Sequence, residues 1–158
     1  MKIYNRIKAV HYAKQHALSP NPDFYHFDDI GGDCTNFVSQ CLLAGGCKMV
    51  YDKTNGWYYN SSYDRSYSWT GVSFLQSFLL SPPTGGPRAQ ICNLKDLAEG
   101  DIIQLRQNNT HFNHTLFVSK ILGGEIYVCA HSSDALDRKL SSYSYKQALP
   151  LHILYADN

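Results

Sequence analysis

The pattern of apolar and polar positions along the chain predicts helices in its first half and strands in its second half. Within residues 3–17, apolar side chains recur at about helical spacing, at Ile3, Ile7, Val10 and Ala17. A second helix is predicted for CTNFVSQCLLA, residues 34–44, because Gly45-Gly46 follows it and such a pair commonly ends a helix. A third helix is predicted from Gly71 to Leu80, ahead of a stretch rich in proline and glycine.

After residue 100 the sequence changes to short runs rich in β-branched and aromatic residues, which predict strands. These runs are DIIQL (101–105), TLFVSKIL (115–122), EIYVCA (125–130) and LHILY (151–155). Gly123-Gly124 predicts a hairpin turn between two of them, and residues 51–69, dense in Tyr, Trp, Asn and Ser, predict a long loop. Helices followed by a small antiparallel sheet are typical of an α+β fold.

Composition narrows the function class. Hydrophobic residues make up 44% of the 158 positions and charged residues 17%, which is typical of a globular protein, and the length predicts a single domain over residues 1–158. The net charge of +1, with Lys and Arg scattered, argues against a nucleic-acid partner. No apolar run reaches the roughly 20 residues of a membrane span. We expect a monomer.

The first 17 residues, MKIYNRIKAVHYAKQHA, are interrupted by charge too often for a signal peptide. The protein is therefore expected in the cytoplasm, or outside the cell and associated with the cell wall if a leader was removed. The sequence leaves both locations open.

Among the five cysteines, an odd number without a CxxC pair, Cys34 has the most informative surroundings. Gly31-Gly32-Asp33 precedes it, and Asp33 is a favourable N-cap, so Cys34 is predicted in the first turn of a helix. There the helix dipole and the unpaired N–H groups are expected to lower the pKa of the thiol and to receive an oxyanion. A small buried cysteine without chemistry is about as good an interpretation.

A thiol nucleophile needs a base, and two of the seven histidines lie at the ends of predicted strands. His114 directly precedes TLFVSKIL, and His131 directly follows EIYVCA. We predict His114 as the base of Cys34 and His131 as the residue that orients it, as in a catalytic triad. The alternative is a metal site of His111, His114, His131 and Cys129, which is disfavoured because residues i and i+3 diverge on an extended chain.

At these residues the sequence resembles a known family. GGDCTNFVSQCLLAGG is similar to the signature of the bacterial "putative amidase domain" family, a branch of the papain-like NlpC-type and CHAP-type cysteine hydrolases. The segments YNRIKAVHYAKQHA, NPDFYHF, SYSWTGVSFLQSFL, GDIIQL with NHTLFVSK, and AHSSDALDRKL resemble further parts of the family in the same order. The resemblance implies a papain-like fold and a Cys-His-His triad of Cys34, His114 and His131. The acidic calcium loop of some CHAP-type relatives has no counterpart, so we expect no metal and no cofactor.

The expected function is therefore cysteine-dependent amide hydrolysis through a thioester, with cell-wall peptidoglycan peptide as the first substrate to consider. A small amide or a protein isopeptide bond remains open. The resemblance to the wider superfamily implies that Asp33 or Tyr25 supports the oxyanion, although Tyr25 has no matched position. Trp57 and Trp69 are expected to form cleft walls for the substrate, and simple packing of the long loop is about as good an interpretation. Two rival classes remain: a non-catalytic peptide- or glycan-binding module on the same fold, and a metal-dependent hydrolase.

Overall fold

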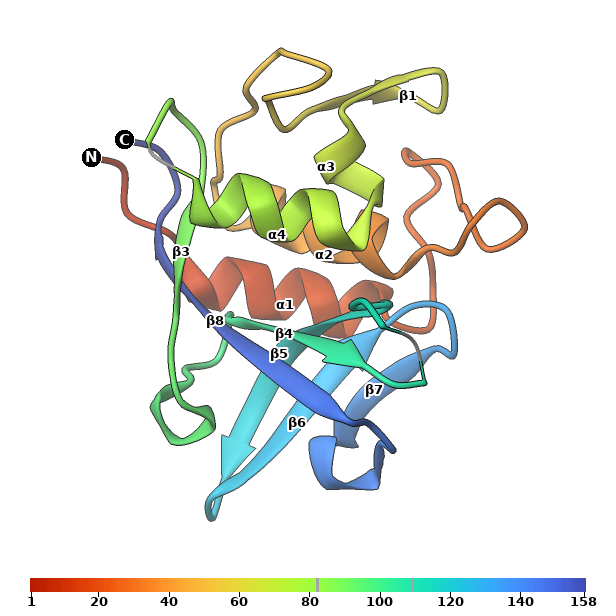
Figure 1. Cartoon of the computed structure of the whole chain (residues 1–158), viewed down its shortest axis with the longest axis vertical. Coiled ribbons are helices and arrows are strands. Elements are labelled where there is room, and N and C mark those ends of the chain that lie inside the picture. The colour runs from red at the N-terminus through yellow and green to blue at the C-terminus, as the bar shows by residue number, and fades with distance from the viewer. Residues whose placement is uncertain (82, 109) are drawn as a thin grey trace.

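The computed structural model describes residues 1–81, 83–108 and 110–158, and its helices lie mainly in the first half of the chain. The helices are α1 (Arg6–His16), α2 (Cys34–Ala44), α3 (Tyr67–Thr70) and α4 (Val72–Leu80), with short 3-10 helices η1 (Leu94–Asp96) and η2 (Leu140–Ser142). Figure 1 shows α1, α2 and α4 stacked in a layer over one side of the sheet, with the two termini close together.

The strands form one main sheet and one small hairpin. The main sheet contains β3 (Arg88–Ile91), β4 (Ile102–Arg106), β5 (His114–Leu122), β6 (Glu125–Ala130), β7 (Ala135–Lys139) and β8 (Gln147–Tyr155). Its strand order is β3-β8-β4-β5-β6-β7, and every neighbouring pair is antiparallel. The hairpin pairs β1 (Tyr59–Ser61) with β2 (Asp64–Arg65). Helices packed on an antiparallel sheet confirm the predicted α+β class.

Most predicted elements are present, and three regions differ. The helix at residues 34–44 has the predicted bounds, and the hairpin turn at Gly123-Gly124 joins β5 to β6. The predicted long loop at residues 51–69 is wrong in part, because it holds the β1–β2 hairpin and the start of α3. Strands β3 and β7 were not predicted, since neither has a clear apolar alternation. Pro82, in the predicted break after α4, lies outside the described residues.

The apolar residues at helical spacing in residues 3–17 do not all lie on the buried face of α1. Ile3 and Ile7 are 86% and 84% exposed, whereas Ala9, Ala13 and Ala17 are fully buried. Small side chains occupy the positions where the helix packs most closely, and Val10 packs against the same cluster while partly buried. The helix begins at Arg6 because the Asn5 side chain accepts a hydrogen bond of 3.0 Å from the Lys8 amide.

Two apolar clusters lie on opposite faces of the sheet. Along β4, Ile102 belongs to the cluster beneath the helices, and its neighbour Ile103 belongs to the second cluster. Helix α2 is buried throughout from Cys34 to Leu42, and it packs on β5. The head of α2 is therefore enclosed beside the start of β5. Among the described residues, none of the helices has the length and apolar character that crossing a bilayer requires.

Candidate active site

Cys34 is held at the head of α2 by contacts to β5. Gly31 and Gly32 have φ angles of 81° and 97°, the left-handed region that favours glycine, and they lead the chain into the helix. The Thr35 hydroxyl lies 2.9 Å from the Thr115 hydroxyl, which joins the first turn of α2 to the second residue of β5. A backbone hydrogen bond from Thr115 also reaches the Cys34 thiol. The sulfur is thus fixed beside the residue that follows His114.

The protonation state of Cys34 differs from the prediction. The side chain is only 8% exposed, and burial raises the pKa of the thiol above its ordinary value. Hydrogen bonds from Thr115 and Thr35 lower the pKa, but by less than burial raises it. The expected depression by the helix head is therefore outweighed by desolvation, and Cys34 rests as a neutral thiol at neutral pH.

His114 is neutral as well. It is the first residue of β5 and 7% exposed, and burial together with the positive charge of Arg138 lowers the pKa of the imidazole to about 4. Among the described residues no side-chain hydrogen bond to the ring is found, so a ring nitrogen is available as a proton acceptor. A neutral thiol and a neutral imidazole are the reactants of general-base catalysis.

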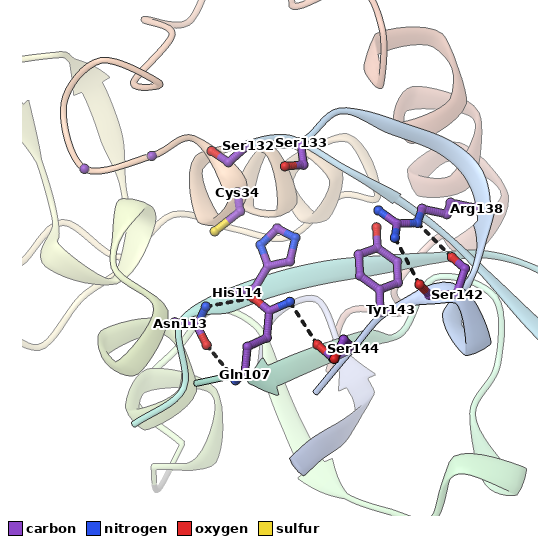
Figure 2. A pocket seen from close by; sticks show the side chains of 12 residues that line it. Cys34, Gln107, Asn113, His114, Ser132, Ser133, Arg138, Ser142, Tyr143 and Ser144 are labelled. Atoms are coloured by element: carbon purple, nitrogen blue, oxygen red, sulfur yellow. Dashed lines mark hydrogen bonds between the residues drawn. The ribbon is translucent and has the colours of Figure 1, made fainter. Parts of the chain in front are cut away.

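Cys34 and His114 line the same cavity, which has a volume of about 460 Å³. In Figure 2 the thiol and the imidazole lie at one end of this hollow, and Arg138 and Tyr143 lie at the other end. Gln107 closes one side, where its side chain accepts a hydrogen bond of 2.9 Å from the Asn113 amide. The structure therefore brings together the two central residues of the predicted triad at an accessible cavity.

The turn after β6 forms part of the cavity wall in an unusual backbone conformation. Ser132 and Ser133 have φ angles of 58° and 81°, which are uncommon for residues other than glycine. The Ser132 hydroxyl accepts a hydrogen bond of 2.7 Å from the Asp33 amide. This hydrogen bond ties the turn to the residue before Cys34. A contact between distant segments therefore holds the strained backbone in place.

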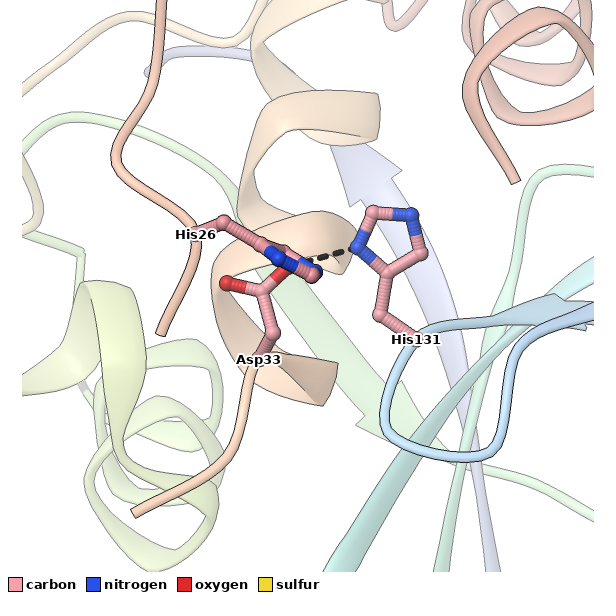
Figure 3. A group of neighbouring side chains, drawn as sticks. All are labelled: His26, Asp33 and His131. Carbon is pink, nitrogen blue, oxygen red and sulfur yellow. Dashed lines mark hydrogen bonds and ion pairs between the residues drawn. The ribbon is translucent and has the colours of Figure 1, made fainter. Parts of the chain in front are cut away.

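His131 does not hydrogen-bond to His114, which corrects the predicted orienting contact. Its Nδ1 lies 2.6 Å from Asp33 Oδ2 (Figure 3). Its Nε2 lies 2.8 Å from the His16 carbonyl, so both ring nitrogens are occupied. The ring also stacks on Phe37 at 4.1 Å between centroids. Since Phe117 pairs with Cys129 across β5 and β6, strand alternation puts His131 on the helix side of the sheet and His114 on the other side.

Asp33 and His131 form a buried ion pair beside the nucleophile candidate. Burial is the largest influence on the pKa of His131 and lowers it, but the hydrogen bonds to Asp33 and to the His16 carbonyl outweigh burial and raise the pKa. Asp33 also accepts hydrogen bonds of 2.8 Å each from the Phe27 amide and the Asn36 side chain. The Asp33 carboxylate is therefore buried and directed to these partners, and it does not line the cavity of Cys34; support of the oxyanion by Asp33 stays a prediction.

Trp57 and Trp69 are fully buried, so they do not form cleft walls. The Trp57 ring nitrogen donates to the Ser39 hydroxyl at 3.1 Å, and that of Trp69 donates to the Asn36 side-chain oxygen at 2.8 Å. The two rings lie 4.7 Å apart between centroids in the cluster beneath the helices. Packing, the alternative left open by the sequence, is their role.

The sequence of this chain is similar to that of known proteins. The model of the "putative amidase domain" family matches residues 3–154. The chain belongs to this family. It is similar to the uncharacterized protein YhbB of Bacillus subtilis (strain 168), with 32% identity over 92% of this chain and 46% of YhbB. It is also similar to the uncharacterized protein YjcM of the same organism, with 29% identity over 87% of this chain and 33% of YjcM.

This member of the amidase family thus spans about half the length of YhbB and a third of YjcM. No solved structure matches it. The description of the family as a "putative amidase domain" suggests amide hydrolysis as the class of activity.

The alternative metal site is not formed in this amidase-family chain. Within the described residues, the potential metal ligands that gather are His26, Asp33 and His131, rather than His111, His114, His131 and Cys129. Asp33 and His131 already satisfy each other, and His26 lies 3.5 Å from Asp33 at the protein surface. We interpret the cluster as a buried ion pair with an exposed histidine beside it.

Sequence reasoning missed three residues of this site. Thr115 binds the Cys34 thiol through its backbone, and backbone contacts leave no signature in the sequence. Arg138 lies within the AHSSDALDRKL segment that resembles the family, but it is an exposed residue, and only its position at the cavity distinguishes it from the other surface arginines. Tyr143 follows the short helix η2, and nothing in its neighbourhood in the sequence indicates a role.

Proposed function

We propose that this member of the family is a cysteine-dependent amide hydrolase of papain-like architecture, with Cys34 as nucleophile and His114 as general base. The observation that carries the proposal is that the thiol at the head of α2 and the imidazole at the start of β5 line one accessible cavity. The Thr115 backbone supports this arrangement, because its hydrogen bond to the thiol fixes the sulfur next to His114 along the chain.

The neutral state of both groups favours proton transfer during attack over an ion pair formed beforehand. His114 accepts the Cys34 proton as the sulfur bonds to the amide carbon, and the carbonyl oxygen becomes an oxyanion. The N–H groups of the first turn of α2 have no partners within the helix, so they are suited to stabilise that charge. His114 then donates the proton to the departing amine, which leaves a thioester on Cys34. Water activated by His114 hydrolyses the thioester and restores the thiol.

As substrate we propose a peptide or glycopeptide amide, with the stem peptide of the cell wall as the first candidate. The family resemblance supports that candidate, and the cavity of about 460 Å³ has room for a short peptide segment. The protein acts as a monomer in this proposal, and the thiol–imidazole chemistry uses no metal.

The proposal is tested by digesting purified peptidoglycan and identifying the products by mass. We expect wild-type protein to release peptide fragments, Cys34→Ala to release none, and His114→Ala to be slower on the order of 10²–10⁴-fold, the usual contribution of a general base. His11→Ala, at an exposed position on α1, is the matched control and should retain activity. Undiminished release by Cys34→Ala would rule out the mechanism.

A further inference from the structure

The end of the cavity opposite Cys34 contains the buried hydroxyl of Tyr143. Tyr143 is 9% exposed and lines the cavity, and its hydroxyl donates no hydrogen bond among the described residues. Burial raises the pKa of this phenol by more than the charge and the hydrogen bond of Arg138 lower it, so the hydroxyl remains protonated and can donate. A buried polar group left unpaired costs stability, and in a cavity it indicates a place for a ligand atom.

Arg138 is held beside this hydroxyl. Its Nε donates to the Ser142 hydroxyl at 2.8 Å, and its Nη2 donates to the Ser142 carbonyl at 3.2 Å. The guanidinium carbon lies 3.8 Å above the centre of the Tyr143 ring. These contacts fix the orientation of the guanidinium beside the Tyr143 hydroxyl, where its charge and a side-chain hydrogen bond act to lower the pKa of the phenol.

The charge of Arg138 is not neutralised by the protein. Among the described residues no carboxylate lies within ion-pair distance of it, and the residues around the cavity include no aspartate or glutamate. Its charge reaches the other end of the cavity, where it contributes to the lowered pKa of His114. This end of the cavity therefore carries a positive charge, and the Tyr143 hydroxyl beside the guanidinium has a proton still to donate (Figure 2).

From this arrangement we propose that Arg138 and Tyr143 form a binding subsite for a carboxylate of the substrate. An ionised carboxylate accepts hydrogen bonds from both a guanidinium and a phenol, and bonds to a charged acceptor are the strong ones. The inference rests on the proposed function only in taking Cys34 as the place of the scissile amide. It narrows the substrate class to amides that carry a negative charge near the bond to be cut.

The distance within the cavity limits where this carboxylate lies. The Tyr143 and His114 rings are 6.2 Å apart between centroids. An extended peptide advances about 3.3–3.6 Å per residue, so the carboxylate belongs within about two residues of the scissile amide. Both a free chain terminus and an acidic side chain satisfy that limit.

The test measures binding in the Cys34→Ala background, where no hydrolysis through Cys34 can occur. Two matched peptide pairs separate the two carboxylate sources: N-acetyl-Ala-Ala acid against its C-terminal amide, and N-acetyl-Ala-Glu amide against N-acetyl-Ala-Gln amide. We expect at least one acid to bind about 10-fold or more tightly than its neutral partner, measured by NMR titration of the His114 ring signals. Equal affinity within both pairs would overturn the proposal.

Two further variants in the same background identify the residues responsible. Arg138→Gln and Tyr143→Phe should each remove most of the acid preference while leaving the affinity for the neutral peptides within about twofold. Tyr143→Phe should change the urea midpoint of unfolding little, because the buried hydroxyl that it removes donates no hydrogen bond in the folded protein. Lys139→Gln, which removes an exposed cation next to Arg138, should retain the full preference. A Tyr143→Phe or Arg138→Gln protein that keeps the preference would contradict the assignment.

Hydrolysis measurements distinguish failure of this subsite from failure of the proposed function. If wild-type protein binds the acid peptides preferentially but neither they nor peptidoglycan are cleaved through Cys34, the nucleophile assignment fails and the subsite stands. If peptidoglycan is cleaved through Cys34 while acid and amide peptides bind alike, the subsite fails and the proposed function stands.

Discussion

Cys34 shows, at the scale of single residues, how two opposing effects act on one thiol. The first turn of α2 favours a thiolate, and the Thr115 and Thr35 hydrogen bonds do the same. Burial disfavours the charged form and is the larger effect, so the pKa is raised. A cysteine placed like a nucleophile thus remains protonated until a base removes its proton, which makes the neutral His114 essential to the proposed chemistry.

This balance predicts how Cys34 responds to alkylation. We expect the rate of its modification by iodoacetamide to rise continuously from pH 7 to beyond pH 9, because the thiolate fraction grows only as pH approaches the raised pKa. Mass mapping of the Cys34 peptide over time measures the rate. His114→Ala should show the same pH dependence, since His114 carries no charge in this range. A plateau reached below pH 7 would indicate a preformed thiolate–imidazolium pair and contradict the expectation.

At the scale of elements, α1 shows that apolar spacing alone does not identify a buried face. Ile7 fits the helical period, yet it is exposed, while Ala9 and Ala13 are enclosed. The structure selects small residues because α1 packs closely against α2 and crosses β5 and β6. Helix α2, by contrast, is buried over nearly its whole circumference. An apolar residue at almost any position from Cys34 to Leu42 therefore lies in the core.

A matched pair of substitutions on α1 tests this assignment. Ala13→Leu adds volume at a fully buried position and should lower the free energy of unfolding by about 1–3 kcal/mol. Ile7→Ala removes a larger side chain from the exposed face and should change that free energy by less than about 0.5 kcal/mol. Urea unfolding of both variants provides the measurement. A larger loss of unfolding free energy for Ile7→Ala than for Ala13→Leu would contradict this assignment of the buried face.

At the scale of the whole molecule, segments far apart in the sequence assemble one cavity. The loop before α2, the start of β5, the turn after β6 and the segment after η2 each supply part of its wall. This enclosure removes water from His114 and lowers its pKa from 6.5 to about 4. The unfolded chain therefore binds a proton at this residue that the folded chain does not bind between these two pH values.

This difference in proton binding makes the folded state less stable at low pH. Because the pKa of His114 is lower in the folded state, the associated stability is complete above about pH 6.5 and is lost as pH falls through the folded value near 4. The loss is about 3 kcal/mol at most, from the size of the shift. Urea unfolding of wild type and His114→Gln from pH 7 to pH 4 measures it, since other titrating groups are common to both. We expect the wild type to lose more stability than the variant; parallel curves would contradict the shift.

The sequence by itself determined the α+β class, the bounds of α2 and the approximate position of β4, β5, β6 and β8, because these rest on local periodicity, capping and turn residues. It also singled out Cys34 and His114, whose positions at the ends of elements can be read locally. Only the tertiary structure decided that His131 pairs with Asp33, because a register difference of one residue directs a side chain to the other face of a sheet. It likewise decided that both tryptophans are core residues and that Arg138 and Tyr143 meet in the cavity, since burial and contacts between distant segments depend on packing.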